Sequence, residues 1–336
     1  MPRTRTIQLG HGSGGVLTRE LVRDVFLAHF DNPALAPLMD SALIEPGSTE
    51  IAFTTDAYVV KPLVFPGGDI GTLAVCGTVN DLAVMGARPV ALSCAMIMRE
   101  GMELDLVEQI TRSMQQAAAG AGVPIVAGDT KVVERTSCDG LFITTAGVGA
   151  VDPANRPGGA IRDGDAVIVN GTIGEHGIAV LVAREGLKVT SPVESDCAAL
   201  NGLVEVLRPL FGRIRIMRDP TRGGLATALN EFVEQSDVGL LLRERDIPVS
   251  AAVGAICELL GLDPLYIANE GKLVLVCDAG AADEVVAAMR SHPLGAQAAV
   301  IGSATSSYPG KVCLETAVGG LRLVDMLVTD QLPRIC

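Results

Sequence analysis

Apolar and polar positions alternate along the first half of the chain in two periods, one typical of strands and one typical of helices. Short apolar runs predict strands at residues 51–60, 89–98, 125–133 and 141–148. Helices are predicted at residues 70–85 and 103–119. In the second of these helices Leu104, Val107, Ile110 and Met114 recur on one face, as expected of a helix packed against a sheet.

The second half repeats this alternation after a break at residues 152–159, where two prolines and two glycines end the first unit. Strands are predicted at residues 165–169, 214–217, 238–242, 272–277 and 298–301, and helices at 175–185, 195–207, 224–235, 250–260 and 281–291. A strand pair is predicted at residues 311–324. Two α/β domains of similar size follow from this pattern.

We expect four segments along the chain. Residues 1–38 form a glycine-rich segment and a helix, 39–152 form the first α/β domain, and 160–310 form the second. Residues 311–336 form the strand pair and a C-terminal tail. From residue 325 the tail spans roughly 40 Å when extended, enough to carry its last residue from solvent into a cleft.

Composition narrows the function. The 336 residues carry a formal net charge of −13 and a sequence pI near 4.8, which argues against nucleic acid or an anionic membrane as partner. Hydrophobic residues make up 49% of the chain, enough for a large core, but no signal-peptide core and no run of about 18 apolar residues occurs. The eight cysteines show no CxxC spacing and lie mostly in apolar runs, which predicts reduced thiols in a cytoplasmic protein.

The last cysteine, Cys336, is an exception because it is the final residue of the chain. Chain ends are usually exposed and loosely held, so this thiol is expected to be accessible. A prenylation signal is excluded because that signal places its cysteine three residues before the end. A mobile thiol suits a carrier of a chemical group, and the alternative is an accidental surface cysteine.

Four aspartates interrupt apolar segments and predict a metal site. They are Asp56 in a strand, Asp81 in a helix, Asp129 near a strand end and Asp219 at a strand-to-helix junction. Buried carboxylates are costly unless paired or bound to metal, and oxygen ligands without His or Cys suit Mg²⁺ bridging phosphates. The alternatives are that Asp219 caps the following helix, Asp81 is a solvated helix residue, and Asp129 pairs with Lys131, which lies on the same side of an extended chain.

Two glycine clusters suggest anion binding. The first consists of Gly10, His11, Gly12, Ser13, Gly14 and Gly15, ahead of a helix starting near Leu17. The second is Gly223-Gly224, whose helix N-terminus can approach a phosphate. The first cluster is neither a Walker A motif nor a dinucleotide-binding fingerprint, and a flexible turn is its alternative.

These segments together resemble the HypE family of hydrogenase maturation proteins. That family lies within the superfamily of ATP-binding enzymes that includes aminoimidazole ribonucleotide synthetase and selenophosphate synthetase. The matching segments span the chain: residues 10–15, 54–57, 71–87, 128–133, 219–225 and 269–271, and the final Pro-Arg-Ile-Cys at 333–336. The aspartate motifs specify only the superfamily, whereas the C-terminal motif narrows the resemblance to this family.

The resemblance implies a fold, an activity and partners. The fold is a two-domain, PurM-like α/β architecture of mixed sheets flanked by helices, with a mobile C-terminal tail, assembled as a homodimer with ATP near the interface. Cys336 receives a carbamoyl group from the carbamoyltransferase HypF and, with ATP and Mg²⁺, the group is dehydrated to a thiocyanate. The cyano group then passes to iron on a HypC–HypD complex.

The resemblance also implies residue roles. Asp56, Asp81, Asp129 and Asp219 hold Mg²⁺, and Asn80 and Thr221 orient phosphate oxygens. Arg222 stabilises charge, the segment 10–15 folds over the triphosphate with His11 as a donor, and Glu270 and Lys131 handle protons. Glu270 as a plain turn residue and Lys131 as an ion-pair partner are the alternatives.

Two rival functions remain open at this point. One is another ATP-dependent enzyme of the same superfamily, such as a selenophosphate synthetase or a small-molecule kinase. The first of these is weakened because no cysteine precedes Cys76, and the second leaves Cys336 without a purpose. The other rival is a carrier or scaffold gated by ATP, which does no chemistry and needs no base at Glu270.

Overall fold

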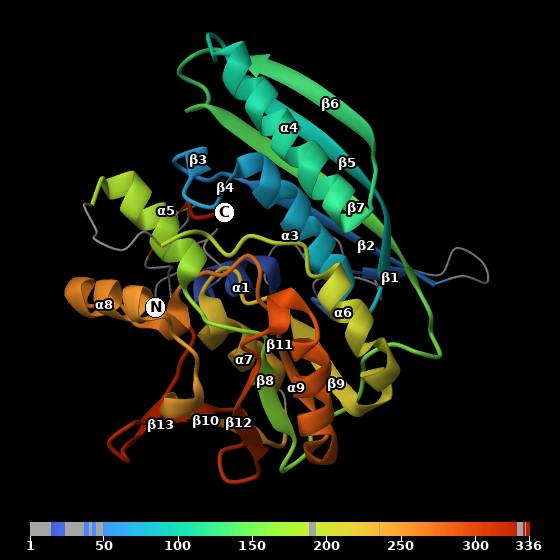
Figure 1. Cartoon of the computed structure of the whole chain (residues 1–336), viewed down its shortest axis with the longest axis vertical. Helices are drawn as coiled ribbons and strands as arrows, with labels where there is room; N and C mark the ends of the chain where they lie inside the picture. The colour runs from blue at the N-terminus through green and yellow to red at the C-terminus, as the bar shows by residue number, and fades with distance from the viewer. Residues whose placement is uncertain are drawn as a thin grey trace.

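Each half of the chain folds around its own β-sheet, and helices pack on both sheets (Figure 1). The computed structural model describes residues 15–23, 37–39, 42–44, 50–187, 193–234, 236–327, 332 and 334–336. Ahead of the first sheet, helix α1 (Val16–Leu21) reaches the second half, where the Val16 amide donates to the Leu327 carbonyl at 3.0 Å.

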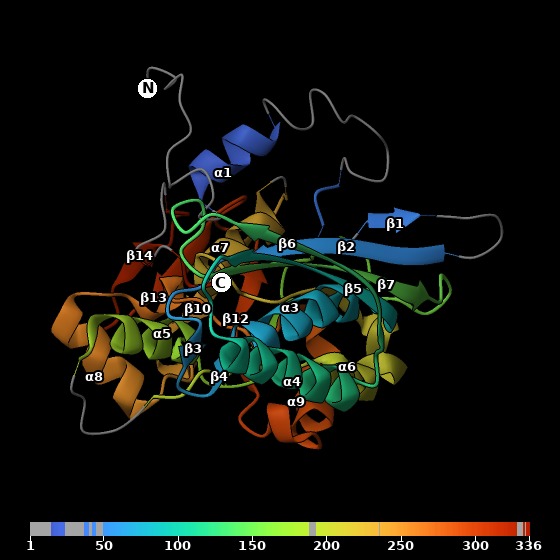
Figure 2. The same cartoon turned by 90° about the horizontal axis from the view of Figure 1, so that it is seen from above.

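The first sheet has the strand order β1-β2-β7-β5-β6 and is antiparallel except between β5 and β6. Its strands are β1 (Ala42–Ile44), β2 (Glu50–Tyr58), β5 (Arg88–Arg99), β6 (Ile125–Val133) and β7 (Leu141–Val151). Helices α3 (Ile70–Val84) and α4 (Leu104–Ala121) cover one face (Figure 2). Only Thr72 and Asp81 of α3 escape full burial, because the sheet, α4 and the second half surround this helix.

The second sheet has the order β14-β13-β10-β12-β8-β11-β9. Its strands are β8 (Ala166–Val169), β9 (Ile214–Arg218), β10 (Gly239–Arg243), β11 (Val274–Cys277), β12 (Ala299–Thr305), β13 (Val312–Glu315) and β14 (Leu321–Leu323). Its helices are α5 (Glu175–Glu185), α6 (Asn201–Leu207), α7 (Gly224–Val233), α8 (Ala251–Leu260) and α9 (Ala282–Arg290). Strands buried on both faces, such as β8 and β11, are continuous apolar runs.

The predicted elements are confirmed in most places, and β6 and α5 have the predicted bounds. The start of α6 is a correction: the helix was predicted from Ser195 but begins at Asn201. Residues 195 and 196 use their side chains to bind other parts of the chain, and the Leu200 amide donates to Asn80 Oδ1 at 2.7 Å. These contacts hold the segment in an extended path ahead of the helix.

The short hairpin of β3 (Val64–Phe65) and β4 (Gly68–Asp69) was not predicted. Asp69 caps α3 by accepting from the amides of Gly71 and Thr72, both at 2.9 Å. This cap fixes where α3 begins and so sets the position of Asp81 further along the helix.

The two halves share part of their core. Buried apolar side chains of β2, α3 and α4 pack in one cluster with those of α5 and α8, and Leu332 and Ile335 of the tail belong to this cluster. The C-terminus therefore ends between the two halves (Figures 1 and 2). Among the described residues, no helix has the length and apolar character needed to cross a membrane.

Candidate active site

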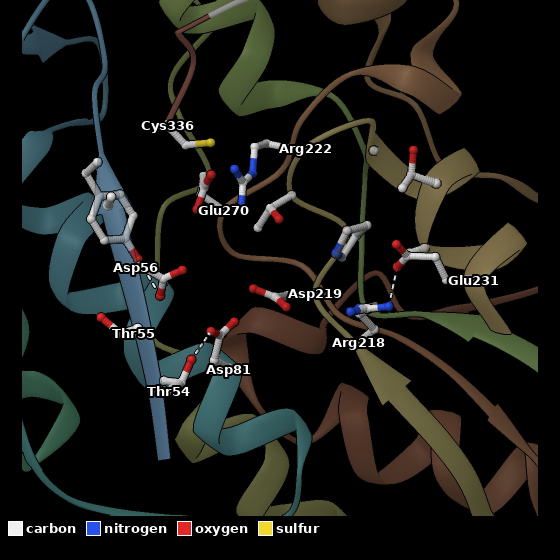
Figure 3. Close-up of a pocket in the computed structure, with 18 residues that line it drawn as sticks. Thr54, Thr55, Asp56, Asp81, Arg218, Asp219, Arg222, Glu231, Glu270 and Cys336 are labelled. Atoms are coloured by element: carbon white, nitrogen blue, oxygen red, sulfur yellow. Dashed lines mark hydrogen bonds and ion pairs between the residues drawn. The ribbon is translucent and has the colours of Figure 1, made fainter. Parts of the chain in front are cut away.

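A cavity of about 290 Å³ lies where the first sheet meets the second half of the chain. Its walls come from β2, α3, the β9–α7 junction, the segment before β11, and the tail. Figure 3 shows the carboxylates of Asp56, Asp81 and Asp219 pointing into the same space, with Cys336, Arg222 and Glu270 gathered at one end. Six residues predicted from widely separated motifs thus meet in one place.

Strand β2 contributes Thr54, Asp56 and Tyr58, three residues at the period-two spacing that points side chains to one face. Asp56 Oδ2 accepts from Thr78 Oγ1 at 3.1 Å and from Tyr58 Oη at 3.2 Å. Tyr58 packs so closely on α3 that a Cβ at Gly77 would lie 2.2 Å from its hydroxyl oxygen. Glycine at that position is therefore required for the tyrosine to reach Asp56.

Asp81 and Asp219 face Asp56 from α3 and from the end of β9. Asp81 Oδ2 accepts from Thr54 Oγ1 at 2.7 Å, so Asp81 is tied to β2 and is not a solvated helix residue. Asp219 does not cap the next helix, because the N-cap of α7 is Gly223 and no described side chain caps it. Both structural alternatives for these aspartates are therefore wrong.

Negative charge dominates the cavity. Burial is the main cause that raises the pKa of Asp56 above its usual value, although hydrogen bonds from Thr78 and Tyr58 and the charge of Arg222 act against it. Proximity to Cys336 is the main cause that raises the pKa of Arg222, and Asp56 and Glu270 add to it. The other arginine in the wall, Arg218, is paired with Glu231.

Glu270 is 2% exposed, and burial raises its pKa well above the usual range, with Asp219, Asp196 and Asp56 adding to the effect. Within the described part of the chain, its Oε1 atom has no hydrogen-bond partner. Its backbone is held on both sides: the amide donates to Asp196 Oδ1 at 3.1 Å, and the carbonyl accepts from Asn80 Nδ2 at 3.1 Å. A protonatable group is thus fixed in place with one oxygen left for a ligand.

Cys336 lies in the cavity wall because the tail is docked between the halves. The tail lies along the residues that directly follow β2. The Val59 amide donates to a Cys336 carboxylate oxygen at 3.2 Å, and the Lys61 amide donates to the Arg334 carbonyl at 3.3 Å. Arg334 forms a two-bond ion pair with Asp139 at 2.6 and 2.8 Å. The terminal thiol is half-buried here and not exposed as predicted for a chain end.

The N-terminus of α7 opens onto the same cavity. Gly224 has a φ of +61°, and a Cβ there would lie 2.6 Å from the carbonyl oxygens of Leu265 and Ile267. Thr221 and Thr227 line the cavity beside this helix end, and among the described residues Thr227 Oγ1 has no partner. An open helix N-terminus with a buried unpaired hydroxyl fits a phosphate group.

Asp129 and Lys131 are not brought to this cavity within one chain. Both lie on the exposed strand β6, where Lys131 Nζ is 3.4 Å from Asp129 Oδ2. The ion pair given above as the alternative to their metal and proton-handling roles is therefore present. In the first glycine cluster, residues 10–14 lie outside the described residues, and Gly15 directly precedes α1.

The phosphate contact predicted for Asn80 is corrected. Its side chain is fully buried and donates to the carbonyls of Ala198 and Glu270, both at 3.1 Å. Its oxygen accepts from the Leu200 amide, so the side chain joins α3 to the second half, and both of its N–H donors are used, which leaves none for a phosphate oxygen.

The donor set fits Mg²⁺ held jointly with phosphates. Among the described residues, no three acidic, histidine or cysteine side chains stand close enough to hold a metal alone. Mg²⁺ in enzymes is usually held by one or two carboxylates plus substrate phosphates, and it keeps several waters. Carboxylates of this kind are supplied by Asp56, Asp81 and Asp219, and they surround a space that a phosphate group can enter.

Several residues of the site were missed in the sequence. Tyr58 could have been found from its period-two spacing to Asp56, but Arg218 and Glu231 carry no sequence signal, since they lie 13 positions apart on β9 and α7 and meet only in the fold. His176 is fully buried at the start of α5 and touches the tail, and nothing in its local sequence predicts this contact.

Comparison with known proteins gives consistent matches over the whole chain. Residues 38–151 match the N-terminal domain of AIR synthase related proteins, and residues 162–312 match their C-terminal domain. The chain is 51% identical to the carbamoyl dehydratase HypE of Rhodobacter capsulatus, covering 99% of each chain.

Two solved structures are similar as well. One is a HypE–HypF complex, with a TM-score of 0.87 and 44% identity, covering 91% of this chain and 99% of that chain. The other is HypE in complex with ATP, with a TM-score of 0.82 and 48% identity, covering 98% of this chain and 100% of that chain.

Proposed function

The chain belongs to the HypE family of carbamoyl dehydratases, and from that premise we propose that it converts an S-carbamoyl group on Cys336 into a thiocyanate with ATP as phosphoryl donor. The observation that carries the proposal is the terminal thiol inside an acid-lined cavity, beside Arg222 and Glu270. The cyano group then serves as a ligand for the iron of a [NiFe]-hydrogenase.

The chemistry proceeds in two steps. The γ-phosphoryl group of ATP is transferred to the carboxamide oxygen of S-carbamoyl-Cys336, which gives an imidate phosphate and ADP. The C–O bond then breaks, phosphate leaves, and the nitrogen loses its remaining proton as the C≡N bond forms. The net change is loss of one water from the carbamoyl group, taken up by hydrolysis of ATP.

The residues of the cavity divide this work. The amides at the start of α7, with Thr221 and Thr227, bind phosphate oxygens. Arg222 lies beside Cys336 and offsets negative charge that develops during transfer. Asp56, Asp81 and Asp219 would hold Mg²⁺, which when bound would offset the negative charge of the triphosphate.

Glu270 is the base that accepts the proton lost from the carbamoyl nitrogen during phosphoryl transfer, and the leaving phosphate carries away the second proton. Its Oε1 atom has no partner among the described residues, and its raised pKa makes the ionised carboxylate a stronger base than an exposed glutamate. An ATP-gated scaffold without chemistry would have no need for a buried carboxyl group at this position. The dehydratase reading therefore explains more of the site than the scaffold does.

We propose further that the protein is a homodimer in which β6 meets a second copy. Every residue of β6 except Val133 is exposed, and Val126 and Val132 remain 66% and 65% exposed on this edge strand. Apolar edge strands are templates for pairing with another chain. Such pairing would bring Asp129 and Lys131 of one copy toward ATP held by the other, which is the only route by which these two residues act in the reaction.

We also propose a donor protein, an acceptor complex and a cellular compartment for this reaction. HypF supplies the carbamoyl group, as the solved HypE–HypF complex of a relative supports. A HypC–HypD complex accepts the cyano group. All eight cysteines are free thiols, which suits the reducing cytoplasm.

The experiment is the mass of the C-terminal peptide after incubation with Mg-ATP, carbamoyl phosphate and active HypF. Wild-type protein is expected to carry a carbamoyl adduct on Cys336 that loses one water when ATP is present. Cys336→Ala should carry no adduct but should bind ATP with unchanged affinity. A wild-type tail that stays unmodified, or an adduct that never loses water, would contradict the proposal.

A further inference from the structure

His176 makes a contact that the proposed chemistry does not explain. The imidazole is fully buried at the first turn of α5, and its Nε2 atom is 3.0 Å from the carbonyl oxygen of Ile335, the next-to-last residue of the chain. The other ring nitrogen, Nδ1, is 2.8 Å from Ser195 Oγ. Both nitrogens of a buried histidine are thus used, and one of them holds a segment that must move.

The direction of each hydrogen bond follows from the partners. A carbonyl oxygen only accepts, so Nε2 carries the proton and donates to Ile335. Burial lowers the pKa of His176 below its usual value, so the ring is neutral and Nδ1 accepts from the Ser195 hydroxyl. Ser195 Oγ in turn accepts from the Cys197 amide at 3.1 Å. The tautomer is therefore fixed by its surroundings.

Phe65 of the hairpin holds the ring in place by an edge-to-face contact, with centroids 5.4 Å apart and planes at 88°. The Ser195 amide donates to the carbonyl of Pro66 in the same hairpin at 2.8 Å. His176 and Ser195 are thus held by contacts with the first half of the chain in addition to their contact with the tail.

Anchoring Ile335 fixes the direction of the Cys336 side chain. The carbonyl of Ile335 belongs to the peptide group that precedes the Cys336 α-carbon, and the Val59 amide holds the carboxylate that follows it. With both sides of the α-carbon held, only rotation about the Cα–Cβ bond remains to place the sulfur.

The same short segment also holds the proposed base. Asp196 follows Ser195 directly and accepts from the amides of Glu270 and Gly271, both at 3.1 Å, while Lys272 pairs with it at 2.9 Å. Ser195 acts on the tail through His176, and Asp196 acts on the backbone of Glu270. Two adjacent residues therefore connect the tail to the position of Glu270.

We propose that His176 is a positioning residue that holds the docked tail through its hydrogen bond to the Ile335 carbonyl. With Ser195 and Asp196, it fixes the position of Cys336 relative to Glu270. The role of Glu270 in this statement rests on the function proposed above. The anchoring of the tail by His176 does not, because it concerns only the docked chain end.

The test is the rate at which iodoacetamide alkylates Cys336 in the full-length protein without ATP or partners, followed by the mass of the C-terminal peptide. His176→Ala leaves the buried Ile335 carbonyl without its donor and is expected to speed alkylation roughly tenfold, because the tail undocks more often. His176→Gln keeps an N–H donor and should restore most of the protection. His292→Gln, at a histidine elsewhere in the second half, is the matched control and should leave the rate unchanged.

A second readout separates positioning from folding. On S-carbamoylated protein at saturating ATP, His176→Ala should slow loss of water roughly tenfold, while the dissociation constant of ATP and the melting temperature stay close to wild type. If His176→Ala does not fold, Ser195→Ala takes its place; it removes the donor to Nδ1 and should speed alkylation to a smaller extent.

An unchanged alkylation rate in folded His176→Ala would overturn the proposal, whatever the wild-type protein does with ATP. Equal loss of ATP affinity and melting temperature in His176→Ala, without rescue by glutamine, would also overturn it. Faster alkylation in a protein whose wild type never dehydrates the carbamoyl group would support the anchor and contradict the proposed function instead.

Discussion

Glu270 is the residue at which structure and chemistry are most closely linked. Its side chain is 2% exposed, and burial followed by the charges of Asp219, Asp196 and Asp56 raises its pKa well above the usual value of 4.5. The folded protein therefore keeps a proton on Glu270 at pH values where the unfolded chain has lost it. A raised pKa also makes the ionised carboxylate a stronger base, which suits it to taking a proton from an amide nitrogen, a weak acid.

Glu270→Gln tests this assignment through stability and activity. Because the folded protein binds the extra proton, the wild-type free energy of unfolding falls as pH rises from the unfolded pKa toward the folded one. The glutamine variant lacks this proton, so its melting temperature relative to wild type should rise as the pH increases above the usual pKa of 4.5 toward the higher pKa of the folded protein. Loss of water from the carbamoyl group should slow roughly a hundredfold or more.

Thermal denaturation without nucleotide and single-turnover mass measurement give the two quantities. A variant whose melting temperature differs from wild type by a constant amount at every pH would show that Glu270 is ionised alike in both states. Such a result would contradict the raised pKa of Glu270 in the folded protein.

Substitution of Asp81 tests whether Mg²⁺ joins the bound ATP to the carboxylates of the cavity. Ligand at a hundred times its dissociation constant stabilises a protein by about 2.7 kcal/mol, so Mg-ATP should raise the melting temperature of the wild type. A chelator should remove most of this shift, and Asp81→Asn should remove it even with Mg²⁺ present. Asp283→Asn, on the exposed first turn of α9, is the control and should keep the shift. An unchanged shift in Asp81→Asn would take this carboxylate out of the ligand set.

Single residues were predictable where their type conflicted with their surroundings. Asp56 in an apolar strand and Cys336 at the chain end are such cases, and both reach the cavity. Asn80 was misassigned because its motif carries the same polar character whether the amide faces a ligand or the backbone of Glu270. His176 was missed because its partners, Ser195 and Ile335, are far from it in sequence.

At the scale of elements, β6 is the part of the fold whose exposure needs an explanation. It is the edge of the first sheet, and apolar Ile125, Val126 and Val132 face solvent in a single chain. Edge strands of this kind are normally covered, twisted away or charged. The second copy of the chain proposed on this edge would account for the exposure and for the position of Asp129 and Lys131.

Val126→Asp together with Val132→Asp should convert the dimer into a monomer, as measured by light scattering. Two charges on an apolar interface cost several kcal/mol in a dimer and almost nothing in an exposed strand. Val318→Asp, at a turn residue that is 94% exposed on the second half, should leave the dimer intact. Wild-type protein that scatters as a monomer at micromolar concentration would contradict the dimer proposal directly.

Elements with a clear period were predicted well, and elements made by side-chain contacts were not. Helix α5 and strand β6 have the bounds that their patterns predict. The start of α6 was wrong because Ser195 and Asp196 satisfy distant groups and so leave the helix. The β3–β4 hairpin has strands of two residues, too short for any periodic signal.

At the scale of the whole molecule, the site exists only because the chain folds back on itself. The carboxylates of the first half meet Asp219 and Glu270 of the second, and the last residue of the chain lies beside a strand near residue 59. The sequence indicated each motif and a tail long enough to reach a cleft. It did not indicate the route of the tail, because that route depends on contacts between residues nearly 280 positions apart, such as Val59 and Cys336.

In the proposed mechanism, the carboxamide oxygen of S-carbamoyl-Cys336 leaves as part of phosphate. The most direct test uses HypF and bicarbonate-derived carbamoyl phosphate labelled with heavy oxygen in its carbonyl group, then Mg-ATP in unlabelled water. Mass spectrometry of the inorganic phosphate should find the heavy oxygen there, in an amount equal to the thiocyanate formed on Cys336. Label found in water, with unlabelled phosphate beside the same thiocyanate, would contradict phosphoryl transfer to that oxygen and with it the mechanism assigned to this cavity.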